Sequence, residues 1–92
     1  MNEDQAQILA LKALSWMATQ DDILGHFLGA AGTDVDTLKS TAGQTETQLA
    51  VLDFLLMQDD WVAEFCRAEN LPPEAPMQAR QFLPGGAEMH WT

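Results

Sequence analysis

The stretches MATQDDILGHFLGAAG, residues 17–32, and LLMQDDWVAEFCRAEN, residues 55–70, decide the fold. Gln-Asp-Asp occurs in both, 38 residues apart, and each time two apolar residues and then a phenylalanine follow. The aspartates are either ligands of a metal ion or the start of a helix in a folding unit that the chain contains twice. The residues around them favour the second explanation.

The similarity between the two stretches extends well beyond the aspartates. When each residue from 11 to 32 is compared with the residue 38 positions later, seven of the 22 pairs are identical. Further pairs, such as Trp16 and Phe54, are chemically similar. This pattern predicts a tandem repeat, with one copy at about 3–43 and the other at about 44–84. Two copies are too few for a solenoid, so we expect one pseudo-symmetric bundle with its first and fourth helices central.

Helix formers, caps and chain breakers predict all-α structure, and no segment alternates as a strand would. Asn2 is the expected cap of the first helix, Gly32 ends the second, Thr33 or Asp34 caps the third, and Thr45 with Gln48 has the spacing of a capping box. The expected domain is a compact bundle of five to six helices over residues 1–86, followed by a tail at 87–92. The expected helices lie near residues 3–19, 21–31, 35–42, 45–58, from 59 to the break at 71–73, and 74–83.

The paired aspartates have a structural explanation, because the start of a helix leaves unpaired N–H groups and a partial positive charge that a carboxylate satisfies. The alternative is a metal site, or a small enzyme, built from Asp22 with His26 and Asp60 with Glu64, each pair four residues apart. Both pairs lie opposite the apolar stripes of their helices, and the Glu-x-x-His spacing of di-metal bundles is missing. We therefore expect no metal and no cofactor.

Composition narrows the class of protein further. The chain has 92 residues, enough for one core, and 4 basic against 14 acidic residues give a net charge of −10. Such a surface repels the phosphate groups of nucleic acids. The second and third helices could form a helix-turn-helix, but its reading helix contains one basic residue, Lys39, and two acidic ones, Asp34 and Asp36, so we expect no binding to nucleic acid.

The longest apolar stretch, residues 49–57, contains Asp53 and is too short to span a bilayer. We expect no membrane association and a cytoplasmic protein, since a single cysteine fits a reducing compartment.

Catalytic residues are not apparent, because Cys66 lies on an inward stripe and His26 on an outer face. Two features favour interaction instead. Gly25 and Gly29 form a flat strip on the outer face of the second helix, and Trp91 lies in the tail. The sequence therefore predicts a non-enzymatic protein–protein interaction module that binds a partner or itself as a homodimer, through a Gly/Trp-containing or acidic surface.

Three segments carry a resemblance to a known family: ALKALSWMATQDDILGHFLGAAGTDVDTLKSTA, LAVLDFLLMQDDWVAEFC and LPPEAPMQARQFLPGG. Over residues 4 to 86 the chain resembles a family of short, mostly alphaproteobacterial proteins that is classified only as a domain of unknown function. The shared motifs are packing and capping signals. The resemblance implies an all-helical fold and a bacterial source, suits a signalling accessory, and implies no activity, cofactor or catalytic residue.

Overall fold

The computed structural model describes residues 1–20 and 22–85, and these residues form helices without strands. In this part of the chain every helix is too short or too polar to cross a membrane. The predicted all-α fold is confirmed. The helices are α1 (Glu3–Ala18), α2 (Ile23–Ala31), α3 (Val35–Thr41), α4 (Thr45–Leu55), α5 (Asp59–Glu69) and α6 (Ala75–Phe82).

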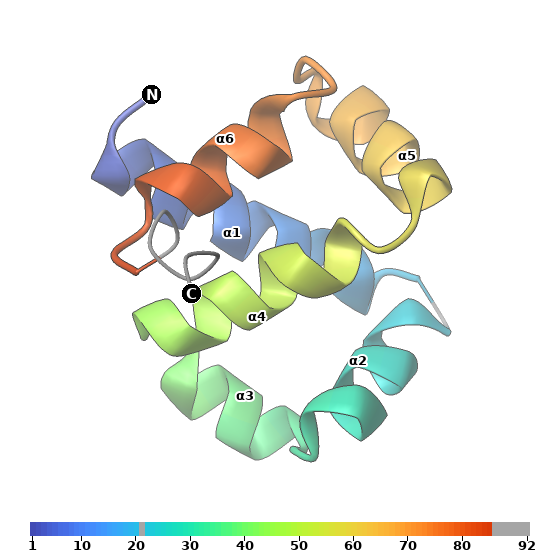
Figure 1. Ribbon diagram of the computed structural model, residues 1–92. Helices are drawn as coiled ribbons and strands as arrows, with labels where there is room; N and C mark the ends of the chain where they lie inside the picture. Colours follow the sequence, from blue (N-terminus) through green and yellow to red (C-terminus); the bar gives the residue numbers. More distant parts are fainter. Residues whose placement is uncertain (21, 86–92) are drawn as a thin grey trace.

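Helix α1 runs through the middle of the bundle (Figure 1). It packs along both α4 and α6 and also contacts α2, while α4 contacts α6 and α2 in turn. The expectation that the first and fourth helices are central is confirmed, and α6 shares that central position. The core is a single cluster whose largest fully buried apolar side chains are Phe65, Met17, Leu52, Leu55, Leu83 and Val51.

The capping residues in the sequence predicted the positions of several helix ends correctly. The Asn2 side chain accepts a hydrogen bond from the Gln5 backbone N–H at 2.8 Å, and the Gln5 side chain accepts one from the Asn2 N–H at 3.0 Å, which completes a capping box. Asp34, one of two predicted caps of α3, accepts the Thr37 N–H at 2.8 Å. Gly32 ends α2 in the left-handed region, at φ 67°.

The predicted capping box of α4 is wrong. The residue before the helix is Gln44 and provides no side-chain cap, and Thr45 is already the first helical residue. Gln48 lies on the same stripe as Val51, Leu52 and Leu55, so it is buried at 2% exposure instead of folding back over the helix start. Its amide nitrogen donates to the Ala42 carbonyl at 3.2 Å, and its Oε1 is buried without a hydrogen-bond partner.

The described aspartates of the repeated phrase do not cap through their side chains. Asp22 precedes α2 without such a hydrogen bond, and α5 begins after Gln58, with Asp59 and Asp60 in its first turn. Their stabilising effect is therefore the interaction of a carboxylate with the helix dipole. Asp21 lies outside the described residues.

Asp53 pairs with a cation that the sequence did not single out. Arg80 of α6 donates through Nε and Nη2 to the two carboxylate oxygens of Asp53, so the pair joins α4 to α6. The packing of α6 on α4 brings these two residues together although they lie 27 positions apart in the sequence.

Some structural features of the two halves correspond. The second helix of each half ends on a left-handed residue, Gly32 at φ 67° and Asn70 at φ 57°, and these positions are 38 residues apart. The third helices differ, because α6 packs extensively on α1 whereas α3 is not among the helices that pack closely on α1 or α4. A repeat over the whole of 3–43 and 44–84 stays a prediction.

Candidate functional site

The residues of the metal hypothesis lie on two separate helices. Asp22 and His26 are exposed at α2, and Asp60 and Glu64 are exposed on α5, which occupies a different part of the bundle (Figure 1). Within residues 1–20 and 22–85, no group of three or more His, Cys, Asp or Glu side chains is placed to hold a metal ion. The hypothesis gains no support from the described part of the chain.

Gly25 and Gly29 are both exposed on α2. A Cβ atom added at Gly25 or Gly29 would meet no heavy atom within 4 Å, so neither glycine is required by packing inside the chain. Neither residue lines one of the hollows described below. Trp91 and the tail at 87–92 lie outside the described residues, and their predicted contribution to binding stays a prediction.

The outer face of α1 is a stronger candidate for a binding surface than the two glycines. Its inward side buries Ala6, Leu9, Ala13 and Met17, as the apolar stripe requires. On the opposite side Ile8 is 54% exposed and Leu11 is 40% exposed. We call Ile8, Leu11, Lys12 and Ser15, with the two hollows that flank them, the α1 face.

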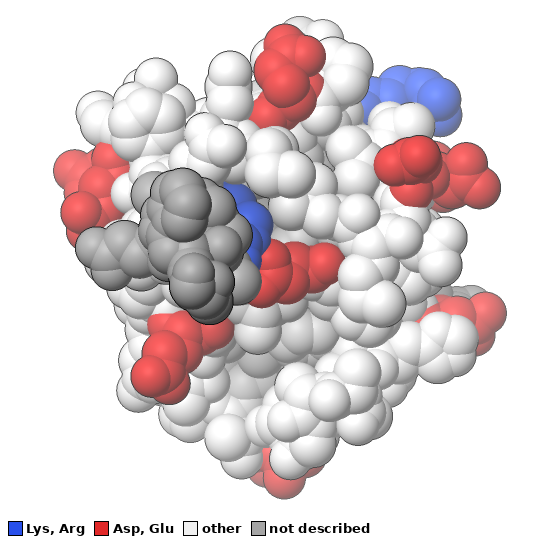
Figure 2. Space-filling model, viewed as in Figure 1, with Lys and Arg blue, Asp and Glu red and all other residues white. Residues whose placement is uncertain are grey.

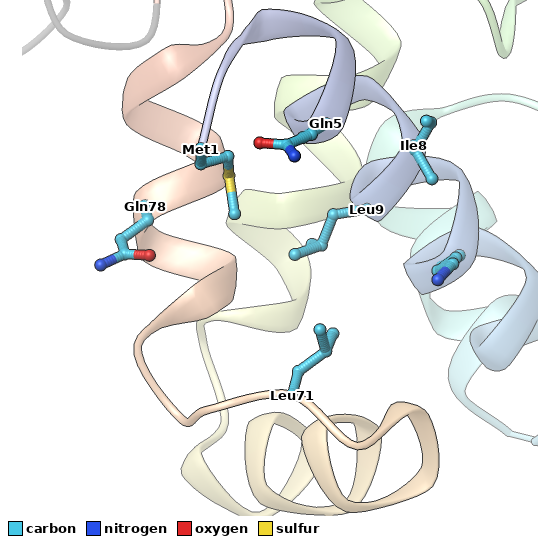
Figure 3. A pocket seen from close by; sticks show the side chains of 7 residues that line it. Met1, Gln5, Ile8, Leu9, Leu71 and Gln78 are labelled. Atoms are coloured by element: carbon cyan, nitrogen blue, oxygen red, sulfur yellow. The ribbon is translucent and has the colours of Figure 1, made fainter.

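The first hollow, which we call the Leu71 hollow, has a volume of about 400 Å³. Leu9 and Leu71 point into it from opposite sides, and the Met1 side chain extends over it (Figure 3). Met1, Leu9 and Leu71 therefore belong to the apolar part of its lining, and the polar residues Gln5 and Gln78 also line it. The full lining is Met1, Gln5, Ile8, Leu9, Lys12, Leu71 and Gln78.

The second hollow, the Val35 hollow, lies between α1, α2 and α3 and has a volume of about 320 Å³. Leu11 and Leu14 of α1 line one side, and Val35, itself 41% exposed, lines another. Lys39 of α3 also contributes to the lining. Since both hollows are lined from α1, they flank the Ile8–Leu11 ridge.

The residues that line these hollows differ in charge from the chain as a whole. Both lysines of the sequence line them, Lys12 the Leu71 hollow and Lys39 the Val35 hollow, and no carboxylate is among the lining residues. Two other hollows each include an acidic residue, Glu46 in one and Asp59 in the other. Figure 2, in the view of Figure 1, shows acidic side chains spread over the face on which α4 lies in front of α1, with few basic ones among them. The linings of the two hollows thus combine apolar surface with positive charge.

Cys66 lines a further hollow of about 440 Å³ together with Arg67 and Leu71. The thiol is free and the residue is buried at 4% exposure, as the sequence predicted. Burial raises the pKa of the Cys66 thiol above its ordinary value, and the nearby negative charge of Glu74 raises it further. A thiol that stays protonated is a poor nucleophile.

These features define a small all-helical domain with an exposed apolar face that carries two cations. A family model described as Protein of unknown function (DUF3572) matches residues 3–86, and the chain belongs to this family. The resemblance to a domain of unknown function is thereby confirmed. Neither the curated proteins nor the solved structures include a significant match to the chain.

Proposed function

We propose that the protein is a non-enzymatic module that binds another protein through the α1 face. The observation that supports this is the exposure of Ile8 and Leu11 on a ridge between two hollows that are lined largely by apolar side chains. Contiguous exposed apolar surface is a property of interaction sites, whereas single exposed apolar residues are ordinary. Covering these two half-exposed side chains would contribute about 1 kcal/mol each, from the transfer energy of an aliphatic side chain.

The non-enzymatic part of the proposal rests on the chemistry of the residues. The one thiol, Cys66, is buried with a raised pKa, which favours its protonated form. Asp22, His26, Asp60 and Glu64 are divided between α2 and α5. A role as a signalling accessory stays an expectation.

The test compares capture of a partner from the native cells by three forms of the tagged protein. Ile8→Glu combined with Leu11→Glu places two charges on the ridge, and we expect it to lose the partner that the wild-type chain retains. Met57→Glu is the matched control, because Met57 is 71% exposed and lines neither hollow. Circular dichroism of all three forms checks that the helices remain.

Two results would contradict the proposal. One is equal recovery of the partner by the wild-type chain and by the Ile8→Glu, Leu11→Glu form. The other is a wild-type chain that recovers no partner and sediments as a strict monomer.

A further inference from the structure

We infer that the partner segment bound at the α1 face is an acidic amphipathic helix, with its apolar side chains in the two hollows and its carboxylates on Lys12 and Lys39. The inference rests on the proposed function and adds the chemistry of the partner. Its basis is charge complementarity, because the lining of these hollows contains both lysines of the chain and none of its 14 acidic residues.

The dimensions suit a helix. The residues of α1 that line the hollows extend from Gln5 to Ala18. At a rise of about 1.5 Å per residue this is roughly 20 Å, which a partner helix of about 14 to 18 residues covers. Apolar residues spaced three and four apart would face Ile8, Leu11 and the hollow floors.

The positions of the lysines determine which charge the partner helix carries. Lys12 lies beside Ile8 on the ridge and Lys39 borders the Val35 hollow, and both side chains are exposed. Carboxylates that flank the apolar stripe of a partner helix would therefore lie near a lysine on each side of the ridge. Lysine residues at those positions of the partner helix would instead be repelled by Lys12 and Lys39.

A second copy of the chain suits the face less well. In a symmetric contact of the α1 face with itself, the lining of one hollow would meet the lining of the same or the other hollow, and neither lining contains a carboxylate that could pair with Lys12 or Lys39. A dimer that dissociates when Ile8 and Leu11 are replaced by Glu would show self-association instead and would overturn the inference.

The test uses three labelled synthetic peptides of about 18 residues, each with leucines at helical spacing. The residues that flank the leucines are Glu in the first peptide, Gln in the second and Lys in the third. We expect fluorescence anisotropy to give the affinity order Glu, then Gln, then Lys. This order is informative because the net charge of −10 alone would favour the Lys peptide.

Single charge reversals then locate the binding site. Lys12→Glu and Lys39→Glu should each weaken the Glu peptide by about three- to tenfold, the size of a lost charge contact that becomes repulsive. Arg67→Glu changes the net charge by the same amount at an exposed residue that lines neither hollow, and it should change the affinity less than about twofold.

Each contrary outcome has a defined meaning. Stronger binding of the Lys peptide, no binding of the Glu peptide, or equal effects of all three reversals would overturn the inference. If Ile8→Glu with Leu11→Glu still abolishes capture of the native partner in such a case, the proposed function stands and only the acidic character of the partner falls.

Discussion

Trp16 of α1 and Phe65 of α5 pack edge to face, with ring centroids 5.9 Å apart and ring planes at 64°. The residues 38 positions away make the reciprocal contact, since Phe54 of α4 packs edge to face on Phe27 of α2 at 5.4 Å and 72°. In both pairs a side chain of the first helix of one half contacts a phenylalanine of the second helix of the other half. These contacts add to those within each half, such as α1 on α2 and Phe54 stacked on Trp61 of α5, so the two halves share one core.

Removal of either phenylalanine should destabilise the whole bundle. Phe65 is completely buried and Phe27 is 3% exposed, so we expect Phe65→Ala and Phe27→Ala each to lower the free energy of unfolding by about 3–5 kcal/mol. Urea unfolding followed by circular dichroism gives these values, and Phe82→Ala, at a 47% exposed residue, is the control. Separate unfolding transitions for the two halves would contradict a single core shared by both.

The Asp53–Arg80 pair should contribute modestly, because the Asp53 side chain is 51% exposed while that of Arg80 is 12% exposed. Arg80→Met keeps the aliphatic part of the side chain and should cost about 0.5–1 kcal/mol, the range of partly exposed ion pairs. Arg80→Ala also loses the packing of that aliphatic part and should cost more. Urea midpoints at low and high salt separate the contributions, since salt weakens only the ionic one. Equal costs for Met and Ala would mean that packing of the aliphatic part contributes nothing.

The helices were predictable because their signals are local. Asn2, Gly32 and Asp34 fix helix ends through bonds or backbone conformations that involve only nearby residues. The capping box at Thr45 was wrong because burial of Gln48 between α4 and the rest of the core overrides a local signal. The Asp53–Arg80 pair could not be predicted, since it depends on how α6 packs on α4.

Only part of the α1 face could be predicted from the sequence. Lys12 and Ser15 mark the solvent side of α1, and Ile8 and Leu11 each precede one of them by four residues, so the helical period places them on that same side. The helical period therefore indicated an exposed apolar surface on α1, but the sequence analysis favoured Gly25 and Gly29 of α2 instead. The hollows themselves were not predictable, because Leu71 and Val35 reach α1 from distant parts of the chain.

The two capped helix starts should respond differently to acid. Hydrogen bonding to the Thr37 backbone N–H lowers the pKa of Asp34 below its ordinary value of 3.8. Its stabilising effect is therefore complete above that value and disappears as the pH falls through the lowered pKa of the folded state. We expect the stability difference between the wild-type chain and Asp34→Ala to shrink at acid pH, as measured by urea unfolding at a series of pH values.

Asn2 provides the matched control for Asp34, because it makes the same kind of bond at 2.8 Å but does not ionise. Asn2→Ala should cost about 1 kcal/mol at every pH at which the chain folds. A cost of Asp34→Ala that is equally independent of pH would show that the carboxylate charge is irrelevant to the cap.

Cys66 should react slowly with thiol reagents in the folded protein. The residue is 4% exposed and its pKa is raised by burial, and to a lesser extent by Glu74, so both access and the thiolate fraction are low. We expect labelling by an aromatic disulfide at mildly alkaline pH to be at least tenfold slower in the native protein than in urea. Glu74→Gln removes the smaller cause and should accelerate native labelling slightly, because the lowered pKa releases more thiolate. Native labelling as fast as in urea would mean that the core around Cys66 opens freely.

The raised pKa of Cys66 should also affect stability at alkaline pH. Because the folded state holds the thiol proton more tightly than the unfolded state, the protein should become less stable as the pH rises above about 9, and Cys66→Ala should remove this effect.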